Sequence, residues 1–295
     1  MQILSPENFS EYELLDCGNF EKLERFGQFI TIRPEPQAVW QSKWDKNVWE
    51  KKAHVRFVPQ SSSSGTWKKL KNMPDQWTFN YQFTSGNKIS FRLGLTSFKH
   101  VGVFPEQAVN WTSIHDFFFN QKLNSKRFLN LFAYTGGASL AARAAGAEVT
   151  HVDSIRQVVS WANENMQKSG LDNIRWMVDD AMKFVKKELR RENFYQGIIL
   201  DPPAYGHGPN GEKWKLEENV AEMIQCVLGI LDPDEHILIL NAYSLGFSAL
   251  VPENLLRTYS KERQSDLQIG ELFLPSQSGF KLPLGVWGKL TKNVR

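Results

Sequence analysis

The sequence contains few cysteines and no evident metal-binding motif. Its two cysteines, Cys17 and Cys226, lie far apart, and neither belongs to a C-x-x-C pair. This spacing indicates neither a disulfide-stabilised scaffold nor a zinc site. The six histidines show no metal-ligand spacing either, so we predict that the protein binds no metal.

Long apolar runs are absent as well. No uninterrupted apolar stretch approaches the roughly 20 residues needed to cross a bilayer, and no apolar run follows a basic start of the sequence. We therefore expect a cytoplasmic protein with no membrane partner. With 295 residues, of which 41% are apolar and 23% charged, the chain is long enough for one large or two modest domains.

The sequence also lacks a large excess of charge, because its net charge is only +3, but the charges are unevenly distributed. Residues 1–100 contain 14 Lys and Arg against 10 Asp and Glu, whereas residues 101–295 contain 21 against 22. Within residues 43–71, eight basic residues and two acidic residues are interleaved with three tryptophans. A basic, aromatic surface suits a phosphate backbone with unstacked bases. The same composition also describes a solvated face with tryptophans packed beneath it.

Residues 1–93 show no long helical periodicity and contain short β-prone runs separated by Gly, Pro, Asn and Ser, which is typical of a small antiparallel domain. The runs are Tyr12–Leu15, Gln28–Ile32, His54–Val58, Trp77–Phe83 and Lys88–Leu93. Residues 94–124 follow as a joint, in which residues 108–123 can form a helix with Phe117 and Phe118 directed into the core. We therefore expect a β-rich N-terminal domain at 1–93, as a candidate for RNA contact, and a second domain at 94–295.

From Arg127 onward, apolar strands alternate with helical segments. The predicted strands are 128–134, the run ending at Asp153, 174–178, the run ending at Asp201, 236–240, 267–274 and 285–290. Strands joined by helical crossovers predict an α/β fold with a mostly parallel, doubly wound sheet of seven strands. The last two strands are expected to form an antiparallel hairpin at one edge.

A glycine pair follows the first of these strands, in the segment RFLNLFAYTGGASLAARAAGAEVTHVD at residues 127–153. Gly136 and Gly137 allow a tight turn and a close approach of the backbone to a ligand. Asp153 ends the next strand, where an acid can accept both hydroxyls of a ribose. The pattern favours an adenosine-containing ligand. A plain structural turn is the alternative, because the spacing is not a full G-x-G-x-x-G.

The second informative motif is YQGIILDPPAYG at residues 195–206. Its apolar strand runs into Asp201-Pro202-Pro203, and two prolines cannot continue a ladder or a helix. Asp201 is therefore expected at the carboxyl end of a parallel strand, where open α/β sheets bind their ligands. An ordinary loop opening with Asp-Pro is the alternative.

Together these motifs resemble those of the class I S-adenosylmethionine-dependent methyltransferases. The likeness covers about residues 90–290 and rests on NLFAYTGGASL, the acid Asp153, the pair Asp179-Asp180 and the DPPAY motif, with HVGVFPEQ ahead of them. Within this class, the sequence is most similar to the 23S ribosomal RNA methyltransferases that modify cytosine C5 or guanine N7. The resemblance implies a Rossmann-like seven-stranded sheet, S-adenosylmethionine as the cofactor and an RNA substrate.

The resemblance also implies roles for individual residues. The glycine loop would wrap the methionine end of the cofactor, the acid after the second strand would hold the ribose, and the DPPAY motif would face the transferred methyl and the base. The implied cofactor-binding residues are Gln107, Tyr134, Thr135, Gly136, Gly137, Asp153, Ser154, Asp180, Ala181 and Asp201. The implied catalytic residues are Asp201, Pro202 and Tyr205.

The sequence departs from the cytosine-C5 enzymes in one place. Those enzymes resemble each other in a cysteine after the fifth strand, where this sequence has Tyr243, and Cys226 lies inside a predicted helix. Cytosine C5 becomes nucleophilic only when a thiolate adds to C6, so a nitrogen target is favoured, because its methylation needs only a well-positioned lone pair. Tyr205 could stack on the base. His207 could remove a proton, although a histidine on a glycine-rich loop is more often simply solvated.

The leading hypothesis is an S-adenosylmethionine-dependent methyltransferase for a base nitrogen of structured RNA, with ribosomal RNA as the first candidate. A methyltransferase for a protein or small molecule is one alternative. An NAD-dependent dehydrogenase built on the same βαβ unit is a second, and a catalytically inactive RNA-binding protein is a third. The sequence leaves the oligomeric state open between a monomer and a homodimer.

Overall fold

The computed structural model describes residues 1–7, 9–61, 64–243, 246–261 and 263–292, and the chain divides into two compact units. The first, called the sheet unit below, contains Met1–Leu4, Gln107–Leu272 and the described residues from Gly285 onward. The second, called the β-rich unit, contains Ser5–Glu106 and Phe273–Leu284. Each unit is described by itself.

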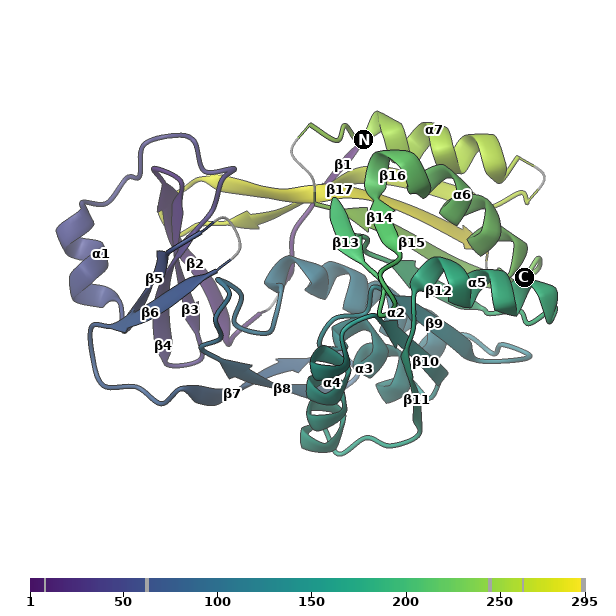
Figure 1. The fold of residues 1–295 in the computed structure, drawn as a ribbon, viewed down its shortest axis with the longest axis horizontal. Coiled ribbons are helices and arrows are strands. Elements are labelled where there is room, and N and C mark those ends of the chain that lie inside the picture. Colours follow the sequence, from purple (N-terminus) through teal and green to yellow (C-terminus); the bar gives the residue numbers. More distant parts are fainter. Residues whose placement is uncertain (8, 62–63, 244–245, 262, 293–295) are drawn as a thin grey trace. The chain divides into compact units, whose positions relative to one another are not determined.

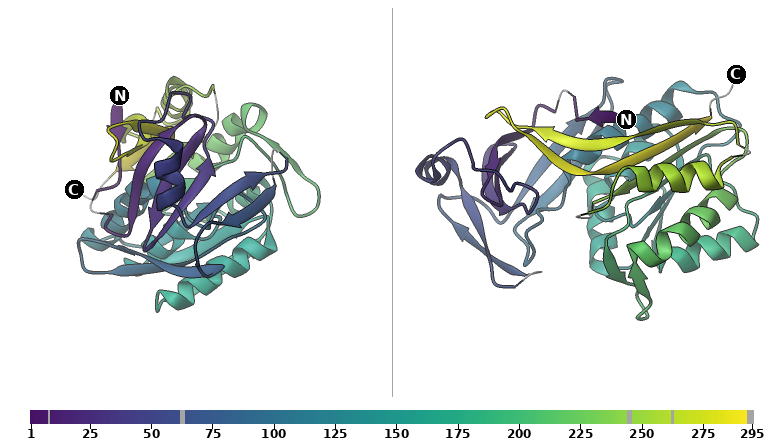
Figure 2. Two further views of the ribbon diagram at one scale, coloured as in Figure 1. Left: turned by 90° about the vertical axis from the view of Figure 1, so that its left-hand side faces the viewer. Right: turned by 90° about the horizontal axis from the view of Figure 1, so that it is seen from above.

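The sheet unit is built on one eight-stranded sheet with the order β1-β16-β17-β15-β12-β9-β10-β11 (Figure 1). Its strands are β1 (Gln2–Leu4), β9 (Arg127–Leu131), β10 (Glu148–Asp153), β11 (Ile174–Val178), β12 (Gly197–Leu200), β15 (His236–Ala242), β16 (Asp266–Pro275) and β17 (Lys281–Lys292). From β15 through β12, β9 and β10 to β11 the neighbouring strands are parallel, whereas β17 runs antiparallel to β15. The long strands β16 and β17 lie side by side (Figure 2).

Helices cover both faces of this sheet because its central strands are buried on both sides, as parallel strands usually are. Every residue of β12 and of β15 is buried. Helices α2, α3 and α4 lie on one face and α5, α6 and α7 on the other (Figure 1). Their bounds are α2 (Ala108–Asn120), α3 (Gly137–Ala144), α4 (Arg156–Lys168), α5 (Ala181–Arg190), α6 (Leu216–Gly229) and α7 (Leu250–Tyr259), with a short 3-10 helix, η1 (Pro105–Gln107), before α2.

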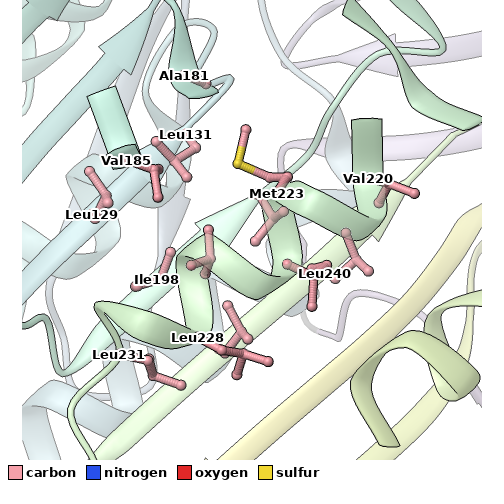
Figure 3. Close-up of a cluster of buried hydrophobic side chains, with 14 of the residues drawn as sticks. Leu129, Leu131, Ala181, Val185, Ile198, Val220, Met223, Leu228, Leu231 and Leu240 are labelled. Atoms are coloured by element: carbon pink, nitrogen blue, oxygen red, sulfur yellow. The ribbon is translucent and has the colours of Figure 1, made fainter. Parts of the chain in front are cut away.

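Side chains alternate along β9, so this one strand packs against the helices on both faces of the sheet. Leu129 and Leu131 face α5 and α6, where they belong to the hydrophobic cluster that also contains Val185 and Met223 (Figure 3). Asn130 points to the opposite face of the sheet, toward α3, where its Nδ2 donates a hydrogen bond to Ser139 Oγ at 3.0 Å. A fully buried aliphatic side chain contributes about 1.5–3 kcal/mol, so this cluster fixes the strand whose end carries the glycine loop.

The seven-stranded class I sheet that the sequence predicts is confirmed, and β1 extends it as an eighth strand. The sequence places residues 2–4 in the N-terminal domain because three residues are too few to show a strand pattern. In the structure β1 pairs in parallel with β16. Gly270 permits this contact, since a Cβ atom there would lie 2.2 Å from the Gln2 carbonyl oxygen.

In its described residues, the β-rich unit contains a five-stranded sheet, a separate hairpin and one helix. The sheet has the order β2-β3-β4-β5-β6. The elements are β2 (Tyr12–Gly18), β3 (Glu21–Phe26), β4 (Phe29–Pro34), α1 (Lys46–Lys52), β5 (Val55–Pro59), β6 (Gly65–Lys69), and the hairpin strands β7 (Gln76–Gln82) and β8 (Lys88–Gly94). Four of the five β-prone runs differ from strands β2, β4, β5 and β8 only at their ends, and the fifth corresponds to β7.

Strand β3, with the sequence EKLERF, escapes prediction because its buried residues include charged ones. Lys22 and Glu24 are both buried, and they form ion pairs within the unit. Lys22 Nζ lies 3.1 Å from Glu35 Oε2, and the Arg33 guanidinium lies 2.7 Å from Glu24 Oε2. Burial of charges is tolerated only when they are paired in this way, and a linear sequence does not show the pairing.

The segment rich in Lys and Trp at residues 43–71 forms α1, β5 and β6. Trp49 is buried, and its Nε1 donates to Asp16 Oδ2 at 3.0 Å. The lysines of this segment are exposed: Lys43, Lys46, Lys51, Lys52, Lys68, Lys69 and Lys71. A packed tryptophan beneath exposed lysines agrees with a solvated face, and contact with RNA stays a prediction.

The structure divides at a different place from the domain boundary that the sequence predicts between residues 93 and 94. The segment 94–106 is bonded to the β-rich unit, since Gly94 N donates to Val101 O and Leu95 N donates to Asp75 O, both at 2.9 Å. The observed division therefore falls between Glu106 and Gln107. Residues 273–284, from the loop end of the β16–β17 hairpin, also belong to the β-rich unit.

Candidate cofactor and catalytic site

The glycine loop that links β9 to α3 has an unusual backbone. Phe132 and Tyr134 have positive φ values of 56° and 49°, which side chains other than glycine rarely adopt, and Gly136 follows at 90°. Gly137 begins α3 close to α2, because a Cβ atom at this position would lie 2.6 Å from the Trp111 indole. The loop is thus a strained, glycine-dependent turn, which is typical of a functional site.

Asp153, at the end of β10, holds this loop. Its Oδ2 accepts a hydrogen bond from Tyr134 N and its Oδ1 accepts one from Ile155 N, each at 2.9 Å. Burial raises the pKa of Asp153, and the bonds from the backbone N–H groups of Ile155, Tyr134 and Ser154 oppose that rise. Each carboxylate oxygen can accept a further bond, so the half-buried group fits the two hydroxyls of a ribose.

A buried polar cluster supports the glycine loop from within the sheet. The Asn130 amide donates to Ser139 Oγ, which also lies 3.0 Å from His151 Nδ1. Burial lowers the pKa of His151 to about 3, so the imidazole is neutral at physiological pH. Asn165 Nδ2 donates to the Thr135 carbonyl at 3.0 Å and fixes the loop backbone from α4. This cluster was not predicted from the sequence, although polar residues inside apolar strands can indicate one.

The acidic pair after β11 starts α5. Asp180 is the N-cap of this helix, because its Oδ1 accepts a hydrogen bond from Lys183 N at 2.9 Å. Asp179 Oδ2 accepts one from Lys187 Nζ at 2.8 Å. The cap orients the Asp180 carboxylate next to the buried Ala181. Binding of the cofactor by Asp180 and Ala181 stays a prediction.

Asp201 lies directly after β12, and two side-chain amides bind its carboxylate. Gln107 Nε2 donates to Oδ2 at 3.1 Å, and Asn241 Nδ2 donates to Oδ1 at 2.8 Å. Burial raises the pKa of Asp201 to about 6, and the hydrogen bond from Asn241 opposes that rise. At neutral pH the group is therefore a carboxylate, and it is only partly accessible to water. These two properties suit a group that accepts a hydrogen bond from an N–H of a substrate.

A short hairpin follows the two prolines and carries Tyr205. It consists of β13 (Tyr205–His207) and β14 (Lys213–Lys215). The buried Trp214 anchors it, since its Nε1 donates to the Pro203 carbonyl at 2.7 Å. Tyr205 is 53% exposed, and its hydroxyl lies 3.0 Å from His207 Nε2. The Tyr205 ring is thus held beside the DPP motif and is accessible to a planar partner.

The structure brings together two groups of predicted site residues. Tyr134 and Asp153 are in contact in the cofactor loop, and Gln107 and Asp201 are in contact at the end of β12. Asn241, which contacts Asp201, was not among the predicted site residues, although it directly follows the apolar run of β15. Binding of the cofactor by Gln107 stays a prediction, and in the structure its amide donates to Asp201.

Neither cysteine belongs to a strand end or loop that forms this site. Cys226 belongs to α6 and packs against the hydrophobic cluster of the sheet unit, and Cys17 is buried in β2 of the β-rich unit. Tyr243, which the resemblance places where the cytosine-C5 enzymes have a cysteine, follows β15 directly. In the described residues, no group of three or more His, Cys, Asp or Glu side chains could hold a metal ion.

The strand order, the glycine loop after the first parallel strand and the acids after the next strands define a class I methyltransferase fold. Residues 56–269 match the family model described as S-adenosylmethionine-dependent methyltransferase. This match covers more than half of the chain, so the protein belongs to that family, with S-adenosylmethionine as its cofactor. The family assignment excludes the NAD-dependent dehydrogenase.

Individual proteins support the assignment. The crystal structure of the SAM-dependent methyltransferase from Agrobacterium tumefaciens is 34% identical, with a TM-score of 0.92 over 99% of this chain and 93% of that one. The structure of SMU.776 in complex with SAH shares the fold, with a TM-score of 0.74 over 97% of this chain and 76% of that one, at 17% identity.

A curated relative is similar over part of its length. The ribosomal RNA large subunit methyltransferase K/L of Shewanella frigidimarina is 30% identical over 155 residues, which are 51% of this chain and 21% of that protein. This chain therefore spans about a fifth of the length of the curated relatives that it matches. In the described residues, no helix is long and apolar enough to cross a membrane.

Proposed function

We propose that this enzyme methylates a nitrogen atom of a base in RNA, with ribosomal RNA as the first candidate, and that it does so in the cytoplasm. The observation that carries the proposal is the arrangement at the end of β12. There a half-buried acceptor, Asp201, is followed by two prolines and by the exposed ring of Tyr205, and Cys226, the cysteine of the same unit, packs against the hydrophobic cluster.

The residues of the cofactor loop fit S-adenosylmethionine. The backbone from Tyr134 to Gly137 would enclose the methionine end, and Asp153 with Ser154 would hold the ribose. Asp180 and Ala181 would receive the adenine at the start of α5. When bound, S-adenosylmethionine supplies an electrophilic methyl group on its sulfonium.

The residues at the end of β12 would position the nucleophile. The Asp201 carboxylate and the Pro202 carbonyl would accept hydrogen bonds from an amino or ring N–H, which directs the nitrogen lone pair toward the methyl group. Tyr205 would stack on the base and hold its plane. The rate enhancement then comes from orientation, which needs no covalent intermediate, and a thiolate is required only for attack by a pyrimidine carbon.

Two surfaces support RNA as the substrate. The register of the β13–β14 hairpin pairs Tyr205 with Lys215 and His207 with Lys213, and all four residues are exposed, whereas the intervening Trp214 is buried. One face of the hairpin therefore offers two rings for bases and two cations for phosphates. The exposed lysines of residues 43–71 would offer a separate cationic surface, on the β-rich unit. The curated relatives named as ribosomal RNA methyltransferases agree with this substrate class.

The test is methyl transfer from labelled S-adenosylmethionine to RNA, followed by mass spectrometry of the digested nucleosides. We expect label in a nitrogen-methylated nucleoside of ribosomal RNA prepared from cells that lack the enzyme, and no label with the Asp201→Ala variant. Label at carbon C5 of cytosine would contradict the nitrogen assignment. Label only in protein or in small molecules would contradict the RNA assignment, and no turnover with any of these substrates would favour an inactive RNA-binding protein.

A further inference from the structure

A chain of three side-chain hydrogen bonds connects β17 to Asp201. Trp287 Nε1 donates to Asn110 Oδ1 at 2.7 Å, and Asn110 Nδ2 donates to Gln107 Oε1 at 2.7 Å. Gln107 Nε2 then donates to Asp201 Oδ2 at 3.1 Å. The chain thus passes from a strand through α2 and η1 to the carboxylate at the end of β12.

The first member of this chain determines the direction of all the others. The indole of Trp287 can donate a hydrogen bond but cannot accept one, so the oxygen of the Asn110 amide must face it. The nitrogen of that amide then faces Gln107, whose oxygen must accept. The nitrogen of Gln107 is left to point at Asp201. Without the indole, each amide could turn by 180° and exchange its oxygen for its nitrogen.

Burial makes this direction important. Trp287, Asn110 and Gln107 are all buried, with Asn110 fully inaccessible to solvent. Water therefore cannot replace a lost donor, and a reversed Gln107 amide would place its carbonyl oxygen against the Asp201 carboxylate. Electrostatic interactions of this kind are strong in a low-dielectric interior. If Trp287 served only for packing, any acceptor would be sufficient for its N–H group. Its acceptor is instead the Asn110 amide, whose nitrogen is bonded to Gln107 and through it to Asp201.

A second arm reaches Asp201 from the same pair of strands. Asn241 on β15 is the Cα partner of Trp287 on β17 in the antiparallel register, and Asn241 Nδ2 donates to Asp201 Oδ1. The carboxylate is thus held by two neutral amides, one bound directly and one oriented through the chain. The hydrogen-bond partners of its two oxygens, Gln107 and Asn241, carry no charge that would compete with a substrate.

We propose that Trp287 and Asn110 are positioning residues for methyl transfer, because they orient the Gln107 amide so that its N–H group always faces the Asp201 carboxylate. The role goes beyond the proposed function, since it applies to any nucleophile that Asp201 binds. Asp201 would contact the substrate, whereas Trp287 and Asn110 act on it only through Gln107.

The most informative variant is Asn110→Asp, which keeps the shape of the side chain and reverses the direction of the hydrogen bond between residues 110 and 107. An aspartate can accept from the Trp287 indole but cannot donate to Gln107, so the Gln107 amide must turn and present its oxygen to Asp201. We expect the titration of Asp201 to move upward by about one pH unit. The readout is the 13C signal of the Asp201 carboxyl in aspartate-labelled protein, assigned by its loss in Asp201→Asn, and it requires neither RNA nor activity.

Two further variants complete the test. Asn120→Asp places the same charge at an exposed position of the same helix, and the Asp201 titration should stay within about 0.3 pH units of wild type. Trp287→Phe removes only the N–H donor and should raise the midpoint by less than Asn110→Asp does. A shift in Asn110→Asp could also come from the new buried charge, whereas Trp287→Phe adds no charge. An unchanged midpoint in folded Trp287→Phe therefore overturns the proposal, and so does an unchanged midpoint in folded Asn110→Asp.

Because the readout is the titration of one carboxyl group, its outcome is independent of the substrate. A shift in Asn110→Asp without methylation of RNA would support the orienting chain and contradict the proposed substrate. Methylation of RNA without any shift of the Asp201 titration would support the proposed substrate and contradict the orienting chain.

Discussion

The backbone N–H of Tyr134 donates a 2.9 Å hydrogen bond to the Asp153 carboxylate. This bond joins the strained loop after β9 to the acid at the end of β10, so Asp153 shapes the loop. If Asp153 also binds the ribose, as we propose, the same acid affects two parts of the cofactor at once.

Replacement of Asp153 by Ala should weaken the binding of S-adenosylmethionine by about 1.5–3 kcal/mol, because charge-assisted hydrogen bonds to the ribose are lost. Calorimetric titration with S-adenosylmethionine measures the effect. The matched control is Asp172→Ala, which removes an exposed acid whose ion-pair partner is Arg143, and it should bind as wild type does. An unchanged affinity in folded Asp153→Ala would contradict the ribose assignment.

Asp201 should make stability depend on pH. Its folded-state pKa is raised by burial from 3.8 to about 6, so the folded state binds the proton more tightly than the unfolded chain does. The resulting stabilisation is present below about pH 4 and is lost as the pH rises through about 6. Relative to Asp201→Asn, wild type should lose about 2–3 kcal/mol of unfolding free energy between pH 4 and pH 8. Urea unfolding of both proteins at the two pH values measures this, and an equal difference at both would refute it.

Tyr205→Ala should weaken RNA binding by about 1–3 kcal/mol, since stacking of a base on an aromatic ring contributes that much. The ring is 53% exposed, so folding should be little affected. Tyr205→Phe is the matched control, because it keeps the ring and removes the hydroxyl bonded to His207. The KM for RNA and the unfolding midpoint of both variants would be compared. Equal KM values for Tyr205→Ala and wild type would exclude stacking.

Gly137→Ala should destabilise the protein by about 1–3 kcal/mol, because the added Cβ atom would lie 2.6 Å from the Trp111 indole and force α2 and α3 apart. Gly94→Ala serves as the control, since its Cβ atom would meet nothing closer than 3.5 Å. Urea unfolding of both variants gives the comparison. A Gly137→Ala protein as stable as Gly94→Ala would show that the α2–α3 contact adjusts without cost.

The sequence identifies those parts of the site that follow from strand ends. Asp153 ends a predicted strand and Asp201 directly follows an apolar one, and parallel strands bring their carboxyl ends to one edge of a sheet. The glycine pair after β9 is visible for the same reason, because a tight turn near a ligand needs a particular residue type. Local pattern is sufficient for such positions.

The partners of Asp201 are not visible in the sequence, because they depend on tertiary contacts. Gln107 and Asp201 are 94 positions apart, and Asn110 and Trp287 are 177 positions apart. No periodicity connects such residues, and an asparagine on an apolar helix face shows neither the orientation nor the partner of its amide. Strand β3 escapes prediction for a related reason, since its charges are paired with residues outside the strand.

Strand β17 follows every other described strand in the sequence, yet it lies between β15 and β16 in the sheet. Strands β15 and β16 can therefore take their places in the sheet only together with a strand that follows both of them in the sequence. If Trp287 orients Gln107 as we propose, the environment of Asp201 also depends on the insertion of β17. Insertion of this one strand would then complete the sheet and the hydrogen bonding of Asp201 in the same step.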